Sequence, residues 1–241
     1  MSFETTNSIN KTARIAGLLY LLLAIFGGGA EFLVRQSMVV PGDAAATAAN
    51  ILASEWTFRL GFLAELAGQV VFIYLVMALY SILKPVNRYQ AVLMVTFVVI
   101  AVTMTCLNML NQFAALFFLG EPGYLAVFNG EQLQALALLF LNMHKVGYLI
   151  AQVFFGLWLL PLGILVYKSG FFPRLLGILL VVACAGYLAD VVIFALFPTV
   201  DLVLSEFTFV GELLLLFWLL VKGVNVERWE TRALETAAQS A

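Results

Sequence analysis

Acid–base chemistry in this chain would depend on one histidine, His144, which stands beside Lys145 just before the apolar run 149–167. Imidazole exchanges a proton near neutral pH, and a neighbouring polar group usually orients it. Placing a lysine and a histidine beside such an apolar run in a membrane also costs free energy, unless other side chains pair with them or form hydrogen bonds to them. We therefore expect polar partners on the other apolar segments.

Polar side chains recur in each of the long apolar segments. Counted at about 1.5 Å per residue from the basic residues that flank each segment, most of them fall at a similar depth. Charged groups within membrane helices normally face the bundle interior or a watery cavity, where they are paired. The sequence therefore predicts one ligand pocket lined by Glu31, Arg35, Arg59, Glu65, Gln69, Asn108, Asn111, Gln112, His144, Lys145, Tyr148, Gln152, Tyr187, Asp190 and Glu212.

Residue spacing along single helices supports this pocket. Glu31 and Arg35 are four residues apart, so they can pair on one helical face. His144 and Tyr148 share a face for the same reason. Glu212 falls nearest the middle of its segment, where a carboxylate must be neutral, paired or hydrated.

These residues also have purely structural interpretations, which the sequence leaves open. The alternatives are an isolated ion pair for Glu31 and Arg35, interhelical hydrogen bonds for Asn108, Asn111 and Gln112, and headgroup contacts for Arg59 and Lys145. Interhelical hydrogen bonds contribute about 0.6 kcal/mol each, and long cationic side chains extend readily to the membrane surface. A lone histidine is also commonly a structural group rather than a catalyst.

The composition indicates that lipid surrounds most of the chain. Apolar residues make up 63% of the 241 residues, charged residues 11%, and the mean hydropathy is +1.04. Soluble domains are closer to half apolar and a quarter charged. Because the chain has no basic patch outside short loops, we expect no nucleic-acid partner.

Apolar runs and chain breakers predict an all-α membrane helical bundle. We expect about six transmembrane helices, at 13–36, 56–83, 88–119, 144–167, 173–196 and 202–221, and two short extracytoplasmic helices, at 44–54 and 131–142. Alternatively, 131–167 forms one long helix that projects beyond the membrane, in either case with a kink at Pro161. The predicted domains are a polar N-terminal segment 1–13, a single transmembrane domain 14–222 and a polar tail 223–241.

Basic residues predict the orientation of this bundle. Nine lie at the N-terminus, in the second and fourth turns between the predicted helices, or in the tail: Lys11, Arg14, Lys84, Arg88, Lys168, Arg174, Lys222, Arg228 and Arg232. Lysine and arginine accumulate on the cytoplasmic side of membrane proteins. We therefore expect both termini in the cytoplasm and a pocket open to the outer side.

Several short stretches carry a resemblance to a known family. They are 14–20 (RIAGLLY), 41–44 (PGDA), 108–112 (NMLNQ), 144–150 (HKVGYLI), 155–163 (FGLWLLPLG) and 186–190 (GYLAD). Together they resemble the bacterial membrane-protein family catalogued as domain of unknown function 4386, over about 13–222. The resemblance implies a bacterial inner-membrane protein. The family has no established activity, so no residue role follows from it.

Three functions remain open from the sequence. The first is binding or transport of a small anionic or lipid-like ligand, attracted by Arg59 and Lys145, with membrane lipids as partners. The second is an enzyme acting on a lipid or isoprenoid, in which Asp190 or Glu212 orients His144. The third is a non-catalytic accessory subunit. We expect no metal site, because the usual set of several histidines is missing; the sequence specifies neither a cofactor nor an oligomeric state.

Overall fold

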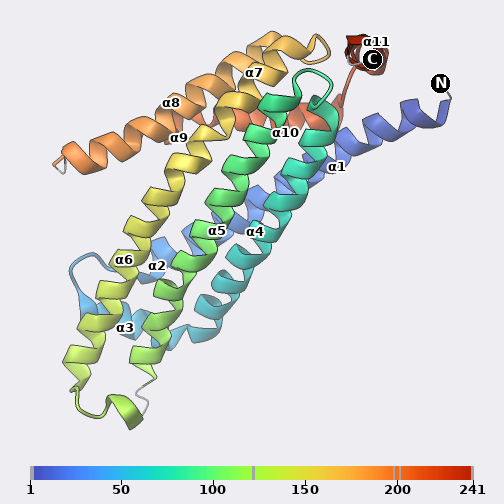
Figure 1. The fold of residues 1–241 in the computed structure, drawn as a ribbon. Coiled ribbons are helices and arrows are strands. Elements are labelled where there is room, and N and C mark those ends of the chain that lie inside the picture. Colours follow the sequence, from blue (N-terminus) through green and yellow to red (C-terminus); the bar gives the residue numbers. More distant parts are fainter. Residues whose placement is uncertain (1–2, 121–122, 198, 201, 240–241) are drawn as a thin grey trace. The chain divides into compact units, whose positions relative to one another are not determined.

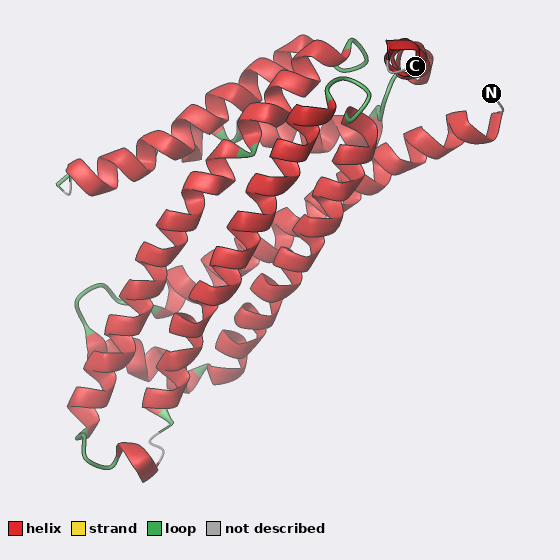
Figure 2. Ribbon diagram, viewed as in Figure 1, coloured by secondary structure: helices red, strands yellow, loops and turns green. Residues whose placement is uncertain are grey.

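The computed structural model describes residues 3–120, 123–197, 199–200 and 202–239, and within them every regular element is helical (Figure 2). The elements are α1 (Phe3–Ala30), η1 (Glu31–Arg35), α2 (Gln36–Met38), α3 (Ala44–Ala53), α4 (Glu55–Leu83), α5 (Arg88–Leu119), η2 (Gly123–Leu125), α6 (Gly130–Leu157), α7 (Leu159–Ser169), α8 (Arg174–Leu196), α9 (Ser205–Thr208), α10 (Val210–Val221) and α11 (Val226–Gln239) (Figure 1). The predicted all-α class is confirmed.

Five helical segments are long and apolar enough to cross a membrane. They are Ile9–Ala30, Glu55–Leu83, Arg88–Leu119, Gly130–Ser169 and Arg174–Leu196. A sixth span is counted if Ser205–Val221 and the tail helix, which meet at a bend of 103°, are taken together. By length and composition, the described residues therefore agree with the predicted membrane bundle of about six spans.

The segment 130–169 differs from the sequence-based prediction. We expected a separate short helix to end near residue 142, but α6 continues through this point to Leu157. The interruption lies at Trp158, three residues before Pro161. Proline has no N–H to donate to the carbonyl four residues earlier, which explains a break at this place. The alternative of one long segment is thus correct; its 40 residues would extend about 60 Å, twice the bilayer core.

The first helix also begins earlier than predicted, at Phe3 rather than near residue 13.

Contacts divide the chain into two compact units. Unit 1 comprises Met1–Leu21, Val71–Val102 and Ile150–Ala241, and unit 2 comprises Leu22–Val70 and Thr103–Leu149. The single transmembrane domain at 14–222 stays a prediction.

Glycines allow close helix packing in unit 1. Gly177 of α8 approaches α7 so closely that a Cβ there would lie 2.6 Å from the carbonyl oxygen of Gly163. Gly211 of α10 approaches Leu179 of α8 in the same way, with a Cβ distance of 2.7 Å. Small residues are the usual means by which membrane helices approach one another. These contacts fix α7 and α10 against α8.

Unit 1 also gathers four segments that the sequence places on one side of the membrane. The N-terminal part of α1, the end of α4 with the turn after it, the turn after α7, and the tail from Val224 through α11 meet through four hydrogen bonds. They are Val224 N to Asn10 Oδ1 (3.3 Å), Arg228 Nη1 to Gly170 O (3.0 Å), Trp229 Nε1 to Ile82 O (2.8 Å) and Thr236 Oγ1 to Pro85 O (2.7 Å). These segments therefore lie together within unit 1. Which face of a membrane they occupy stays a prediction.

Unit 2 has an apolar core at one end. Ile51 of α3, Phe58 of α4 and Leu116 of α5 are buried in one cluster with Val34 of η1. Helix α3 begins at Asp43, whose side chain accepts a hydrogen bond from Ala46 N over 2.8 Å, as its position before an alanine-rich run predicts. This core holds η1 beside α4.

Candidate functional site

A π-helical turn places the first charged pair of unit 2. In η1 the N–H of Gln36 donates to the carbonyl of Glu31, five residues earlier, instead of four as in an α-helix. Within this turn Arg35 Nε donates to Glu31 Oε2 over 2.6 Å. The four-residue spacing predicted this pair, and its contact is confirmed. Single π turns of this kind are frequent at functional sites.

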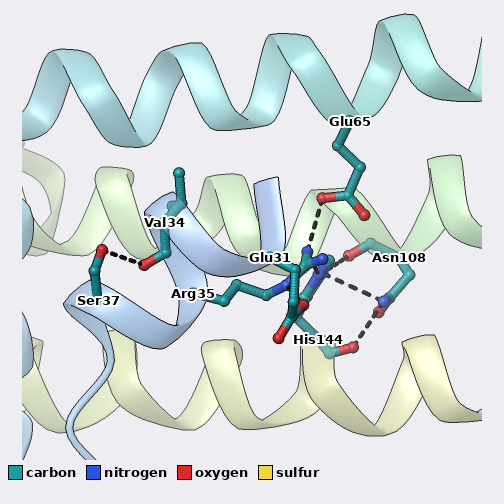
Figure 3. A network of polar contacts seen from close by, with 7 residues as sticks. All are labelled: Glu31, Val34, Arg35, Ser37, Glu65, Asn108 and His144. Atoms are coloured by element: carbon teal, nitrogen blue, oxygen red, sulfur yellow. Dashed lines mark hydrogen bonds and ion pairs between the residues drawn. The ribbon is translucent and has the colours of Figure 1, made fainter. Parts of the chain in front are cut away.

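Arg35 reaches α4 because η1 approaches that helix at a glycine. A side chain at Gly61 would overlap Val34. One helical turn further along α4, Glu65 accepts a hydrogen bond from Arg35 Nη1 over 2.8 Å, and only 4% of its side chain is exposed. Figure 3 shows Arg35 between the two carboxylates. The guanidinium is therefore neutralised from both sides.

His144 of α6 joins the same guanidinium. Its Nε2 lies 3.1 Å from Arg35 Nη1. A guanidinium has only donors, so Nε2 must be the acceptor, and the single proton of the neutral imidazole is on Nδ1. Nδ1 then donates to the backbone carbonyl of Asn108, 3.2 Å away. The geometry therefore assigns one neutral tautomer to a side chain that is only 1% exposed.

Asn108 of α5 completes the connection between α5 and α6. Its Nδ2 donates to the carbonyl of His144 over 2.8 Å, and its Oδ1 accepts from Asn111 Nδ2 over 3.0 Å. A Cβ at Gly147 would overlap Asn108 Oδ1, so this glycine makes room for the amide. The linked residues Glu31, Arg35, Glu65, Asn108, Asn111 and His144 are called the Arg35 cluster below.

Three buried oxygens of unit 2 lack a hydrogen-bond partner among the described residues. They are Gln69 Oε1, Thr105 Oγ1 and Gln112 Oε1. Gln69 is one turn from Glu65, and Thr105 is one turn from Asn108, so each shares a helical face with a member of the Arg35 cluster. More than nine in ten buried polar groups have a partner, and an exception requires a specific explanation.

The remaining predicted residues of unit 2 lie at its surface or edge. Arg59 Nη2 pairs with Glu55 Oε1 over 2.7 Å, and both side chains are about two-fifths exposed. Lys145 is exposed. Tyr148 lies beneath the Arg35 guanidinium, with 5.5 Å between Cζ and the ring centroid. In the described part of unit 2, both arginines are thus held by carboxylates.

The other predicted residues belong to unit 1. Asp190 caps α9: its Oδ1 accepts from Leu204 N over 2.6 Å, and its Oδ2 accepts from Ser205 N over 3.1 Å and from Gln152 Nε2 over 3.3 Å. The sequence favours Asp201 as the cap of the helix expected at 202–221, but Asp201 lies outside the described residues. Glu212 is held by Tyr187 and by Tyr20. That all these groups share one pocket stays a prediction, because it combines residues of both units.

Sequence reasoning missed several residues that position these groups. Glu55 precedes Arg59 by four residues, a spacing that signals an ion pair. Tyr20 gave only the weaker signal of a hydroxyl in an apolar run. Gly61 and Gly147 gave no signal, because glycine is common in membrane helices. Their role appears only when the neighbouring helix is in place.

The histidine of the Arg35 cluster has a hydrogen-bond partner on each of its two ring nitrogens. Among the described residues of unit 2, no hydrogen bond joins His144 to a carboxylate. No group of three metal-binding side chains is found among the described residues. The arrangement can therefore hold donors and charge in fixed positions, with Glu31, about two-fifths exposed, as its most accessible carboxylate.

Comparisons with known proteins agree with this picture of a membrane protein without an assigned reaction. An uncharacterized protein of Archaeoglobus fulgidus is 31% identical over 148 residues, which cover 61% of this chain and 73% of that protein. No solved structure matches. The family model described as Domain of unknown function (DUF4386) matches residues 15–223. The chain thus belongs to this family of unknown function, as the six sequence stretches indicated.

Proposed function

We propose that this integral membrane protein binds, and carries across the bilayer, a small ligand at the Arg35 cluster and the three unpartnered oxygens beside it. The observation that carries the proposal is the set of oxygens on Gln69, Thr105 and Gln112, which are buried without a partner among the described residues. Each such group costs about 1–3 kcal/mol when nothing bonds to it. A ligand or ordered water that donates to these oxygens would remove this cost.

The chemistry of the groups selects the ligand class. The amide oxygens of Gln69 and Gln112 can only accept hydrogen bonds, so the ligand must supply N–H or O–H donors to them; the Thr105 hydroxyl can accept or donate. An anion would need a cation that no carboxylate already holds. In the described part of unit 2, Arg35 and Arg59 are both paired, which leaves the exposed Lys145. We therefore propose a donor-bearing ligand, either a free hydroxylated or amino solute or a lipid headgroup with the same groups.

The enzymatic alternative has less support from the geometry. A general acid or base must reach the atom that gains or loses the proton. His144 is 1% exposed, and its nitrogens already contact Arg35 and the carbonyl of Asn108. The accessory-subunit alternative predicts that the unpartnered oxygens bind nothing, so one experiment separates it from ligand binding.

The experiment compares Thr105→Val and Gln112→Leu with the wild type. Protein purified in native lipid particles is analysed by mass spectrometry for co-purifying lipids and solutes. We expect a donor-bearing species enriched above its membrane or buffer ratio in the wild type and reduced at least tenfold in both variants. A bound lipid remains in the particles when they are dialysed against buffer. A bound free solute is lost on dialysis, and adding it back restores binding.

Thr96→Val is the matched control. Its hydroxyl is exposed and donates to the carbonyl of Val92 over 3.0 Å, so its loss should leave ligand retention unchanged. If the wild type retains only bulk lipid at bulk ratios, and Thr105→Val raises the thermal stability, the oxygens are simply unpaired and the proposal is wrong.

We also propose the location as a cytoplasmic membrane with both termini on the cytoplasmic side. The proposal is supported by the distribution of lysine and arginine along the sequence. It is further supported by the hydrogen bonds that join the N-terminal helix, two turns and α11 within unit 1. Membrane lipids are then its immediate partners.

A further inference from the structure

A second polar group, separate from the proposed ligand site, lies in unit 1. Glu212 of α10 accepts hydrogen bonds on both carboxylate oxygens. Tyr20 of α1 donates to Oε2 over 2.7 Å, and Tyr187 of α8 donates to Oε1 over 3.0 Å. Three helices therefore hold this carboxyl group in a fixed position.

The Glu212 carboxylate forms no ion pair with a described cation. Among the residues that the structure describes, no lysine, arginine or histidine is within ion-pair distance of Glu212. Its surroundings are apolar: Trp158 lies against Tyr20 at a centroid distance of 6.2 Å, and Leu215 and Leu216 are buried on the same helix. An unpaired anion in such surroundings is costly, and a carboxyl group there usually takes up a proton instead.

The titratable and charged groups on the neighbouring elements of unit 1 do not change this balance. Among the described side chains they are Lys11, Arg14 and Tyr20 on α1, Arg174, the buried thiol Cys184, Tyr187 and Asp190 on α8, and Glu206 on α9. The basic residues and Glu206 are exposed. Both oxygens of Asp190 are occupied by N–H groups of the α9 terminus and Gln152. The two tyrosines are thus the direct partners of Glu212.

Close backbone packing is found next to Glu212 on the α8 side. A Cβ at Gly211, next to Glu212, would lie 2.7 Å from the backbone carbon of Leu179 in α8. A proton neutralises a carboxylate without requiring additional volume.

We propose that Glu212 is a reversible proton-binding site, with Tyr20 and Tyr187 as the hydroxyl groups that pass the proton. The tyrosine beside one carboxylate oxygen gives its hydroxyl proton to that oxygen and takes a proton from water on its other side, which leaves a neutral acid and a neutral tyrosine. The new O–H of the acid donates back to that tyrosine oxygen, while the other tyrosine continues to donate to the second oxygen. Only O–H bonds form or break, and release reverses the step.

Infrared spectroscopy of the full-length protein in lipid tests this site. A neutral carboxylic acid gives a carbonyl stretching band that an ionised carboxylate lacks. We expect this band in the wild type at neutral pH, its shift in heavy water and its loss on alkaline titration. Glu212→Gln should remove it. Tyr187→Phe should shift its frequency, because the acid loses one hydrogen bond.

Glu206→Gln is the control, since Glu206 is an exposed carboxylate of the neighbouring α9 and should leave the band unchanged. A wild-type protein without a band that depends on Glu212 overturns the proposal, as does a band that alkaline titration cannot remove. If Glu212→Gln fails to fold, the Tyr187→Phe shift decides alone: an unchanged band contradicts the assignment.

Discussion

Arg35 and His144 meet through Nη1 and Nε2 at 3.1 Å, although 109 residues separate them in the sequence. The donor-only guanidinium holds the imidazole in its neutral form, and the same nitrogen donates to Glu65. One side chain of the short η1 turn therefore connects α4 with α6. It also prevents Glu65 from being a buried, unpaired charge.

Replacing Arg35 should therefore destabilise the protein strongly. Arg35→Met leaves the Glu65 carboxylate buried without a cation, a change that typically costs about 3–5 kcal/mol. The measurement is unfolding of the purified protein in detergent. Arg59→Met is the matched control, because both side chains of the Arg59–Glu55 pair are about two-fifths exposed and such pairs contribute less than about 1 kcal/mol. Equal losses in the two variants would contradict the role given to Arg35.

Gly61 and Gly147 of unit 2 leave room for side chains of neighbouring helices, so a Cβ at either position should destabilise the protein. Gly147→Ala would force Asn108 away from His144, and Gly61→Ala would push Val34 and its π turn from α4. We expect each to cost about 1–3 kcal/mol, as overpacking does. Gly27→Ala serves as the control in α1: a Cβ there meets nothing within 4 Å, and alanine favours a helix by about 0.5–1 kcal/mol. The readout is the melting temperature, which should fall only for the first two variants.

The sequence predicts helices well and the contacts between them poorly, for a physical reason. The bounds 88–119 follow directly from an apolar run between chain breakers, and the structure reproduces them in α5. The Glu31–Arg35 contact follows from local spacing. The pairing of Arg35 with Glu65 does not, because it depends on the close approach of η1 to Gly61 across 30 residues.

The same limit explains the error at residue 142. Asn142, His144 and Lys145 interrupt an apolar pattern, so the sequence favours a helix boundary there. In the structure His144 stays inside α6 because its polar atoms are satisfied by Arg35 and Asn108 on other helices. Hydrogen bonds from other helices therefore keep His144 in a helix that the local sequence would end. The helix is interrupted instead at Trp158, before Pro161.

Loss of the cap on α9 should loosen that helix without unfolding the protein. Asp190→Ala removes the acceptor of the N–H groups of Leu204 and Ser205, which costs about 0.5–2 kcal/mol at a helix start. Hydrogen exchange should become faster in the peptide that contains Ser205–Thr208. Hydrogen exchange in α5 should not change, because Asp190 makes no hydrogen bond to that helix. Unaltered exchange at α9 would show that the cap contributes nothing.

Reporter fusions should place the gathered segments of unit 1 in the cytoplasm. The argument combines the basic residues of the turns with the hydrogen bonds from α11 to Pro85 and Gly170, which require these turns and the tail to share one side. A fluorescent protein fused after residue 241 should be bright, and alkaline phosphatase there should be inactive. Alkaline phosphatase inserted at Gly42, in the turn before α3, should be active because one span separates it from the N-terminus. The opposite pattern would show that the orientation is the reverse of the proposed one. Active alkaline phosphatase at both positions would contradict an even number of spans.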